Sequence, residues 1–339
     1  MQITTRLREE DQMGSVLPGL NEIESAARLI YQTMPATAQY SWPLINARAG
    51  AEVWVKHENH TQVGAFKVRG GLVYMDWLRR EHPEVETVVS ATRGNHGQSM
   101  AFAAARYGIR VVIVVPFGNS AEKNRAMRAL GAELVEFGED FQAASEHAER
   151  LERENGWHRV PSFDLKLVTG VATYALELFS ACRALETIYV PIGMGSGVCG
   201  TIAARNALGL ATKVVGVVSS HAPAYALSFA AGEVREHEAA TAIADGVACR
   251  KPDAVAVEII RAGMDRVVMV DDDEVKDAMR AYFVDTHNVA EGAGAVGLAG
   301  LLKDRANGGQ RVATVLTGGN VNSDVFGEVL CESRVALLA

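Results

Sequence analysis

Several classes of protein are excluded by what this sequence of 339 residues lacks. The N-terminus from Met1 to Gln12 has no apolar run of signal-peptide type, and no segment is long enough to span a membrane. The formal net charge is -8 and no basic tract offsets it, so a nucleic-acid partner is not expected. We therefore expect a cytoplasmic protein that binds neither nucleic acid nor membranes.

Cysteine is also scarce, and its spacing excludes two further kinds of site. The four residues are far apart, at Cys182, Cys199, Cys249 and Cys331, without CxxC or Cys/His spacing. This pattern indicates neither a zinc site nor a disulfide framework. Reduced thiols in a cytosolic protein are the expectation.

The composition is that of a globular protein with a sizeable core, because 48% of the residues are hydrophobic and 22% are charged. The length suggests two domains or one large α/β unit. We expect the first 20 residues to be an arm or an unstructured lead. There is no repeat of fixed period and no low-complexity linker.

Strand and helix patterns alternate along most of the chain, and several strands are continuously apolar. This alternation predicts parallel sheets covered by helices on both faces. Strands are expected at 51–55, 85–91, 111–115, 133–137, 187–192, 214–218, 267–270 and 312–316. Helices are expected at 21–31, 68–80, 97–107, 120–130, 141–155, 170–184, 197–208, 272–286 and 294–304.

A lysine follows the first expected strand after a polar loop. From Gly64 the pattern becomes helical, which places Lys67 near a helix N-terminus beside the apolar Phe66. The positive end of a helix disfavours an ammonium group, and a desolvated lysine there has a lowered pKa and can act as a nucleophile. Taken alone, the position also fits an ordinary surface lysine.

Two loops that join a strand to a helix have compositions that suit anions. The loop Thr92 to Gln98 reads Thr-Arg-Gly-Asn-His-Gly-Gln, and open α/β sheets bind ligands at such strand ends. A plain turn with Asn95 as helix cap is the alternative. The loop Gly193 to Gly200 reads Gly-Met-Gly-Ser-Gly-Val-Cys-Gly, and its alternating glycines let successive amides surround a phosphate.

The second loop also fits G-x-G-x-x-G at residues 195–200, so a dinucleotide site must be considered. That site expects an acidic residue at the end of the next strand. Here the strand 214–218 ends in Ser-Ser-His, which counts against a nicotinamide cofactor. A structural turn is the other alternative.

A third loop, Leu316 to Asn322, places the hydroxyl of Thr317 at the end of the last strand beside two glycines. A lysine amine, a phosphate cradle and this hydroxyl together suit pyridoxal phosphate, which carries an aldehyde, a phosphate and a ring nitrogen. The motifs Gly-Ala-Phe-Lys-x-Arg-Gly, Gly-Asn-His-Gly-Gln, the glycine cradle and Gly-Gly-Asn-Val occur in this order. The chain resembles the fold-type-II pyridoxal phosphate enzymes from about residue 43 to 322, and within them the threonine/serine dehydratase and serine racemase group in its short, catabolic form.

The resemblance implies an α/β fold with two open, twisted, mostly parallel sheets flanked by helices. A large cofactor-binding domain would comprise residues 1–84 and 166–339, and a small substrate-loop domain residues 85–165, with a cleft between them. A homodimer is implied as well. No metal is expected, because the acids that bind one in metal-dependent relatives are replaced around Val218 and Pro223.

The resemblance also implies roles for individual residues. Lys67 is the Schiff-base lysine and moves the α-proton, and the loop 92–96 holds the carboxylate of a small amino acid substrate. The implied cofactor contacts are Phe66, Lys67, Asn95, Gly193, Met194, Gly195, Ser196, Gly197, Glu291 and Thr317. The implied substrate contacts are Thr92, Arg93, Gly94, Asn95 and His96. Phe66 packs near the cofactor, Asn95 hydrogen-bonds its 3′-oxygen and Thr317 meets the pyridine nitrogen.

The implied reaction is dehydration of a β-hydroxy-α-amino acid to a 2-oxo acid and ammonia. Serine racemases place a second base, a serine, where this chain has Arg93, whose guanidinium stays protonated, so racemisation is not expected. Arg93 could contact the β-substituent, the carboxylate or the cofactor, or form a salt bridge that points away. The carboxylate of 3-hydroxyaspartate would pair with it, and the ring of phenylserine would stack on it. β-Replacement or racemisation is the alternative, and a non-catalytic ligand-binding protein is another.

Overall fold

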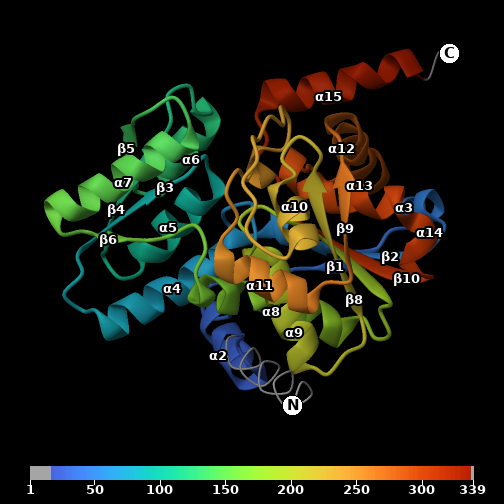
Figure 1. Ribbon diagram of the computed structural model, residues 1–339, viewed down its shortest axis with the longest axis horizontal. Helices are drawn as coiled ribbons and strands as arrows, with labels where there is room; N and C mark the ends of the chain where they lie inside the picture. Colours follow the sequence, from blue (N-terminus) through green and yellow to red (C-terminus); the bar gives the residue numbers. More distant parts are fainter. Residues whose placement is uncertain (1–16, 337–339) are drawn as a thin grey trace.

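The computed structural model describes residues 17–336, with side chains up to residue 332, and in that range the strands form two separate sheets (Figure 1). The expected N-terminal arm lies outside the described residues as far as residue 16. One sheet has six strands in the order β1-β2-β10-β7-β8-β9, and the other has four in the order β5-β4-β3-β6. The expected α/β fold with two mainly parallel sheets is therefore confirmed.

The six-stranded sheet is parallel except at its edge, where β1 pairs with β2 in antiparallel register. Its strands are β1 (Gln39–Ser41), β2 (Glu52–His57), β7 (Thr187–Pro191), β8 (Lys213–Ser219), β9 (Arg266–Val270) and β10 (Arg311–Leu316). One face packs on α2 (Leu20–Ile30), α8 (Leu165–Ala181), α9 (Ser196–Ala207) and α11 (Ala254–Gly263). The other face packs on α3 (Pro43–Ala49), α12 (Asp272–Thr286) and α13 (Gly292–Lys303).

The four-stranded sheet is parallel throughout and lies to the left in Figure 1. Its strands are β3 (Thr87–Ala91), β4 (Arg110–Val115), β5 (Glu133–Glu136) and β6 (His158–Arg159). One face packs on α4 (Lys67–Glu81), α5 (Asn95–Ala105) and α6 (Ala121–Ala129), and the other on α7 (Phe141–Asn155). All four strands fall inside 85–165, while the exact domain division stays a prediction.

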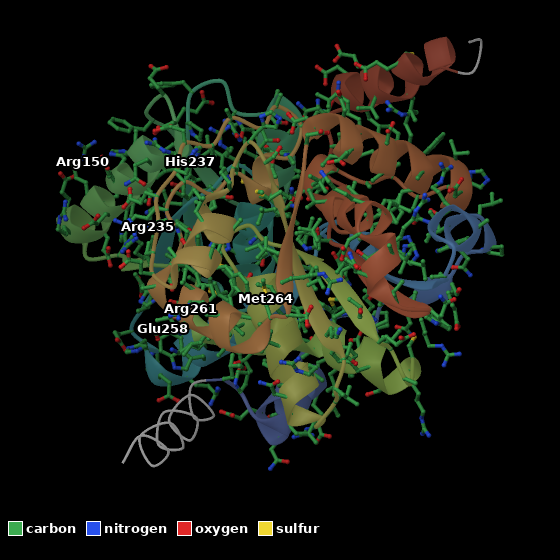
Figure 2. The ribbon with its side chains drawn as sticks, turned by 45° about the vertical axis from the view of Figure 1, so that its right-hand side comes forward. Arg150, Arg235, His237, Glu258, Arg261 and Met264 are labelled. Atoms are coloured by element: carbon green, nitrogen blue, oxygen red, sulfur yellow. The ribbon has the colours of Figure 1, made fainter. Side chains whose placement is uncertain are left out.

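Several short elements were not expected from the sequence. The strands β1 and β6 have three and two residues, and the helix α3 begins at Pro43. The segment between β8 and β9, left unassigned by the sequence pattern, contains α10 (Ala224–Ala231), the short helix η2 (Asp245–Val247) and α11. Arg261 of α11 donates a 2.7 Å hydrogen bond to the carbonyl of Gly232 at the end of α10, on the surface seen in Figure 2. The other elements are η1 (Glu58–His60), α14 (Arg305–Gly308) and α15 (Ser323–Ala336).

Candidate active site

Lys67 is the first residue of α4 and lies next to the end of β10. The backbone amide of Phe66 donates a 3.0 Å hydrogen bond to the carbonyl of Thr317, and Ala65 bridges to Gly318. The hydroxyl of Ser99 in α5 donates a 2.6 Å hydrogen bond to the Lys67 carbonyl. The lysine is thus fixed from the six-stranded sheet on one side and from α5, which packs on the four-stranded sheet, on the other.

The Lys67 side chain lies in a cavity with little solvent around its amine. Desolvation lowers the pKa of Lys67 to about 8, and the negative charge of Glu291 opposes the shift. The ammonium lies 5.1 Å from the centroid of the Phe66 ring. A lysine whose pKa is this low is partly neutral near pH 8 and can act as a nucleophile or a base.

This cavity extends from Lys67 to the glycine-rich loop after β7. It is lined by Phe66, Lys67, Asn95, Pro191, Gly193, Met194, Gly195, Ser196, Gly197, Gly246, Val247, Glu291, Ala293 and Thr317. Gly195 has a φ of 101°, a conformation that other residues rarely adopt, and a Cβ at Gly193 would collide with the carbonyl of Gly246. The helix α9 starts at Ser196, so its free amides and its positive end face an anion placed there.

Two buried tyrosines form hydrogen bonds to backbone carbonyls of this glycine-rich loop. The hydroxyl of Tyr174 in α8 donates a 2.8 Å hydrogen bond to the carbonyl of Gly197 and lies 2.9 Å from the hydroxyl of Thr201. The hydroxyl of Tyr225 donates a 2.8 Å hydrogen bond to the carbonyl of Met194. The loop is therefore preorganised, which lowers the cost of binding a phosphate.

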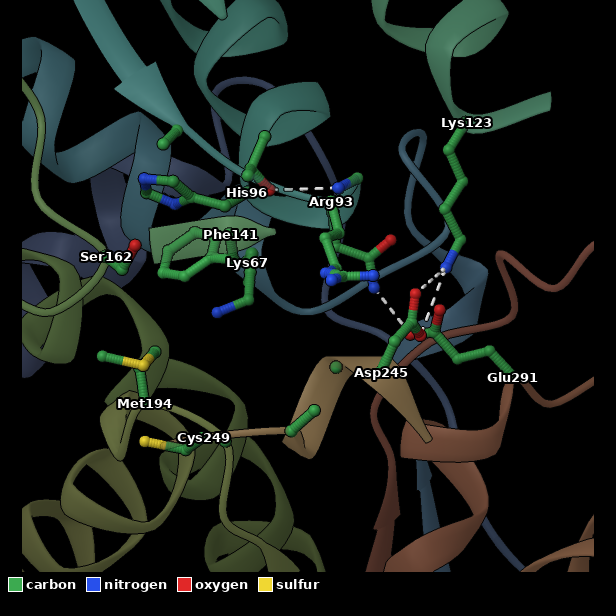
Figure 3. Close-up of a pocket in the computed structure, with 17 residues that line it drawn as sticks. Lys67, Arg93, His96, Lys123, Phe141, Ser162, Met194, Asp245, Cys249 and Glu291 are labelled. Atoms are coloured by element: carbon green, nitrogen blue, oxygen red, sulfur yellow. Dashed lines mark hydrogen bonds and ion pairs between the residues drawn. The ribbon is translucent and has the colours of Figure 1, made fainter. Parts of the chain in front are cut away.

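A second cavity opens from the same lysine toward the four-stranded sheet and its helices (Figure 3). It is lined by Lys67, Ala91, Thr92, Arg93, Gly94, Asn95, His96, Lys123, Phe141, Ser162, Gly193, Met194, Asp245, Gly246, Ala248, Cys249 and Glu291. Burial, with a contribution from the charge of Lys67, lowers the pKa of His96 to about 3, so its ring is neutral. Its Nε2 atom is buried and has no hydrogen-bond partner among the described residues.

Polar contacts across this cavity join elements that belong to the two sheets. Asn95 donates a 2.6 Å hydrogen bond to Glu291 and accepts one of 2.8 Å from Asn320. Lys123 of α6 forms a 3.1 Å ion pair with Asp245 of η2. Burial raises the pKa of Glu291 to about 7, an effect that Lys123 and the Asn95 hydrogen bond reduce. Asn95 and Lys123 are thus held by directed contacts to residues that follow strands of the six-stranded sheet.

The structure brings every expected site residue into these two connected cavities. Arg93 lines the second one and forms no ion pair or hydrogen bond with any described residue, so no salt bridge directs it away. Sequence analysis missed Lys123, Phe141, Ser162, Asp245 and Cys249. For Lys123 a signal existed, because it lies in the first turn of the helix after β4, at the same kind of strand end as residues 92–96.

The fold and the cavities define a class of α/β enzyme in which a lysine amine faces an anion-binding glycine loop across one cleft. The family model described as "Pyridoxal-phosphate dependent enzyme" matches residues 34–318, and the chain belongs to this family. The residues present fit the cofactor: Lys67 offers an amine for the aldehyde, residues 193–197 offer amides for the phosphate, and Thr317 offers a hydroxyl for the ring nitrogen.

Relatives and solved structures agree with this assignment. The chain is 31% identical to an L-threonine ammonia-lyase of Thermotoga maritima over 93% of this chain and 79% of that protein. It is 30% identical to the catabolic L-threonine dehydratase of Escherichia coli over 88% of this chain and 92% of that protein. It spans 66% of a biosynthetic L-threonine dehydratase of Salmonella typhimurium. A threonine deaminase from Solanum lycopersicum superposes with a TM-score of 0.87 at 25% identity, covering 97% of this chain and 89% of that one. A pyridoxal 5′-phosphate-dependent aspartate racemase superposes with a TM-score of 0.85 at 26% identity. The match covers 90% of this chain and 97% of that one.

Proposed function

We propose that this protein is a pyridoxal phosphate-dependent ammonia-lyase that dehydrates a β-hydroxy-α-amino acid to a 2-oxo acid and ammonia. The observation that carries the proposal is that Lys67 lies where the glycine-lined cavity meets the cavity of loop 92–96. Relatives at about 30% identity that are named threonine ammonia-lyases or dehydratases support the same reaction.

When bound, the cofactor supplies an electron sink that makes the α-proton of an amino acid acidic. In this proposal Lys67 anchors the cofactor and then moves that proton, for which its lowered pKa suits it. Residues 193–197 hold the phosphate, and Phe66, Asn95, Glu291 and Thr317 surround the ring. The threonine hydroxyl cannot keep the ring nitrogen protonated as a carboxylate would, and this favours elimination over transamination.

The loop 92–96 would bind the substrate carboxylate through the N-terminus of α5. Net dehydration removes the α-proton and the β-hydroxyl as one water, and the released enamine then takes up water and yields ammonia. By its resemblance to serine racemases, the chain would have Arg93 in the position of their second base, and a guanidinium does not accept a proton. Elimination without racemisation is therefore proposed.

The substrate is proposed to be of the serine or threonine type, with a β-substituent that is small, aromatic as in phenylserine, or anionic as in 3-hydroxyaspartate. The test is release of 2-oxo acid and ammonia by the holoenzyme across these four compounds. Lys67→Ala should abolish both products, whereas Lys213→Ala, at the exposed start of β8, should leave them unchanged. An amino acid product without 2-oxo acid would instead support racemisation or β-replacement.

Two wider proposals concern assembly and location. We propose a homodimer in the cytoplasm, in which the small domain, residues 85–165, closes over bound substrate. Within the described residues, no helix is both long and apolar enough to cross a membrane. Light scattering of the holoenzyme tests the dimer, since a monomer at working concentration would contradict it.

A further inference from the structure

Arg93 is a cation in the substrate cavity whose charge no described residue matches. It immediately precedes Gly94, the N-cap of α5, and its side chain lies among the cavity residues in Figure 3. The fork of its guanidinium can donate two parallel hydrogen bonds to a carboxylate. Its side chain is exposed, so water solvates the guanidinium in the open cavity and leaves it free to bind an anionic group of a ligand.

The other charged groups in the cavity have partners. Lys123 is paired with Asp245 at 3.1 Å, and its side chain is only 13% exposed. Glu291 accepts a hydrogen bond from Asn95. Lys67 belongs to the cofactor in the proposed function. Once these groups are set aside, Arg93 is the cation of the cavity that forms no ion pair with a described residue and has no role with the cofactor.

The α-carboxylate of an amino acid does not need this arginine. The helix α5 has 11 residues, and the amides of its first turn, at Asn95, His96 and Gly97, have no acceptor within the helix. The amide of Gly94 is already bonded to the hydroxyl of Thr92 at 3.0 Å, and the next two residues, Asn95 and His96, line the cavity. A carboxylate at this helix end is stabilised by the free amides and the helix dipole.

We propose that Arg93 is a specificity-determining residue that binds a second carboxylate, and that the substrates are β-hydroxy-α-amino dicarboxylic acids such as 3-hydroxyaspartate. This inference rests on the proposed function and narrows its substrate class. A methyl or hydrogen substituent would leave the guanidinium unpaired when the cleft closes. An aromatic ring could stack on it but would leave its hydrogen-bond donors unused.

The test uses ligands that bind but have no β-hydroxyl to lose. The holoenzyme is titrated with aspartate and with asparagine, each as both enantiomers, and the absorbance of the bound cofactor is followed. The two ligands have nearly the same shape and differ by one negative charge. We expect aspartate to half-saturate the enzyme at a concentration at least about tenfold lower than asparagine, the order expected for a charge-assisted pair.

Variants test whether the preference for aspartate depends on Arg93. Arg93→Met should remove the preference for aspartate, and Arg93→Lys should restore part of it because the charge returns without the fork. Arg106→Met is the matched control: it removes an arginine at the C-cap of the same helix, away from the cavity, and should keep the preference. Unaltered far-UV circular dichroism and cofactor absorbance establish that each variant is folded and loaded.

Equal binding of aspartate and asparagine to the wild-type holoenzyme would overturn the inference, and so would a preference that survives Arg93→Met. The two proposals fail differently. If serine or threonine yields ammonia but aspartate is not preferred, the dicarboxylate inference is wrong and the lyase stands. If aspartate binds through Arg93 but no hydroxyamino acid releases ammonia, the second carboxylate site stands and the lyase is wrong.

Discussion

Replacing Glu58 by glutamine tests how the lysine-bearing helix is anchored. Arg69, two residues after Lys67, donates hydrogen bonds of 2.7 and 3.0 Å to the two oxygens of Glu58. It also donates one of 2.6 Å to Glu177 of α8, which pairs with Lys56 at 2.6 Å. The side chains of these four residues are at most 6% exposed. Two positive and two negative charges therefore balance in the interior beneath the first turn of α4.

The change keeps the size of the side chain and removes one negative charge from this balance. Breaking a buried pair by removing one partner costs about 3–5 kcal/mol. We expect the lower end, about 3 kcal/mol, for two reasons. Glu177 still faces Arg69, and burial lowers the pKa of Lys56, so loss of its proton costs less than for a lysine in water.

The assay is urea unfolding followed by circular dichroism, with the cofactor at one saturating concentration throughout because a ligand adds to the apparent stability. Glu81→Gln is the matched control. It makes the same chemical change in the last residue of α4, where the side chain is 57% exposed, and should cost less than about 0.5 kcal/mol. A loss below about 1 kcal/mol for Glu58→Gln would refute the claim that the pair is desolvated.

Three further predictions concern the cofactor and the thiols. Tyr174→Phe removes the hydrogen bond to the Gly197 carbonyl and should weaken binding of pyridoxal phosphate about fivefold, roughly 1 kcal/mol; equilibrium dialysis showing equal affinity would contradict it. The apoprotein should capture pyridoxal phosphate covalently at a rate that rises with pH as Lys67 loses its proton, with a midpoint near 8, whereas a midpoint near 10.5 would mean a solvated amine. The exposed thiol of Cys331 should react rapidly with a disulfide reagent in the folded protein. Burial raises the pKa of Cys249 to about 12, so its thiol should react slowly. Rapid reaction of several thiols would contradict this burial.

Much of the fold could be predicted because local patterns and tertiary structure agree. The helix α12 occupies the expected residues 272–286, since its apolar face follows Asp271, which forms a capping box with Glu274. The short strands β1 and β6 could not be predicted. With two or three residues they carry no periodicity, and they exist because a neighbouring strand offers unpaired backbone groups.

For the candidate site, ligands bind parallel sheets at the carboxyl ends of the strands, and this rule was sufficient to predict that the three loops lie close together. It did not predict the pairing of Lys123 with Asp245, which are 122 residues apart and lie in helices that follow strands of different sheets. Asp245 lies in the irregular segment between α10 and α11, where no motif marks it. The surroundings of Arg93 likewise depend on how the two sheets and their helices meet, which local sequence does not encode.

The most direct test of the central claim is to reduce the holoenzyme with borohydride, digest it and find the modified lysine by mass spectrometry. We predict that the pyridoxyl phosphate group is attached to Lys67. Lys67 and Lys123 both line the cavity of loop 92–96, so the amine of Lys123 is the competing candidate. The experiment discriminates between these two lysines. Attachment to Lys123 or to any other lysine, or the absence of a modified peptide from yellow holoenzyme, would contradict the account.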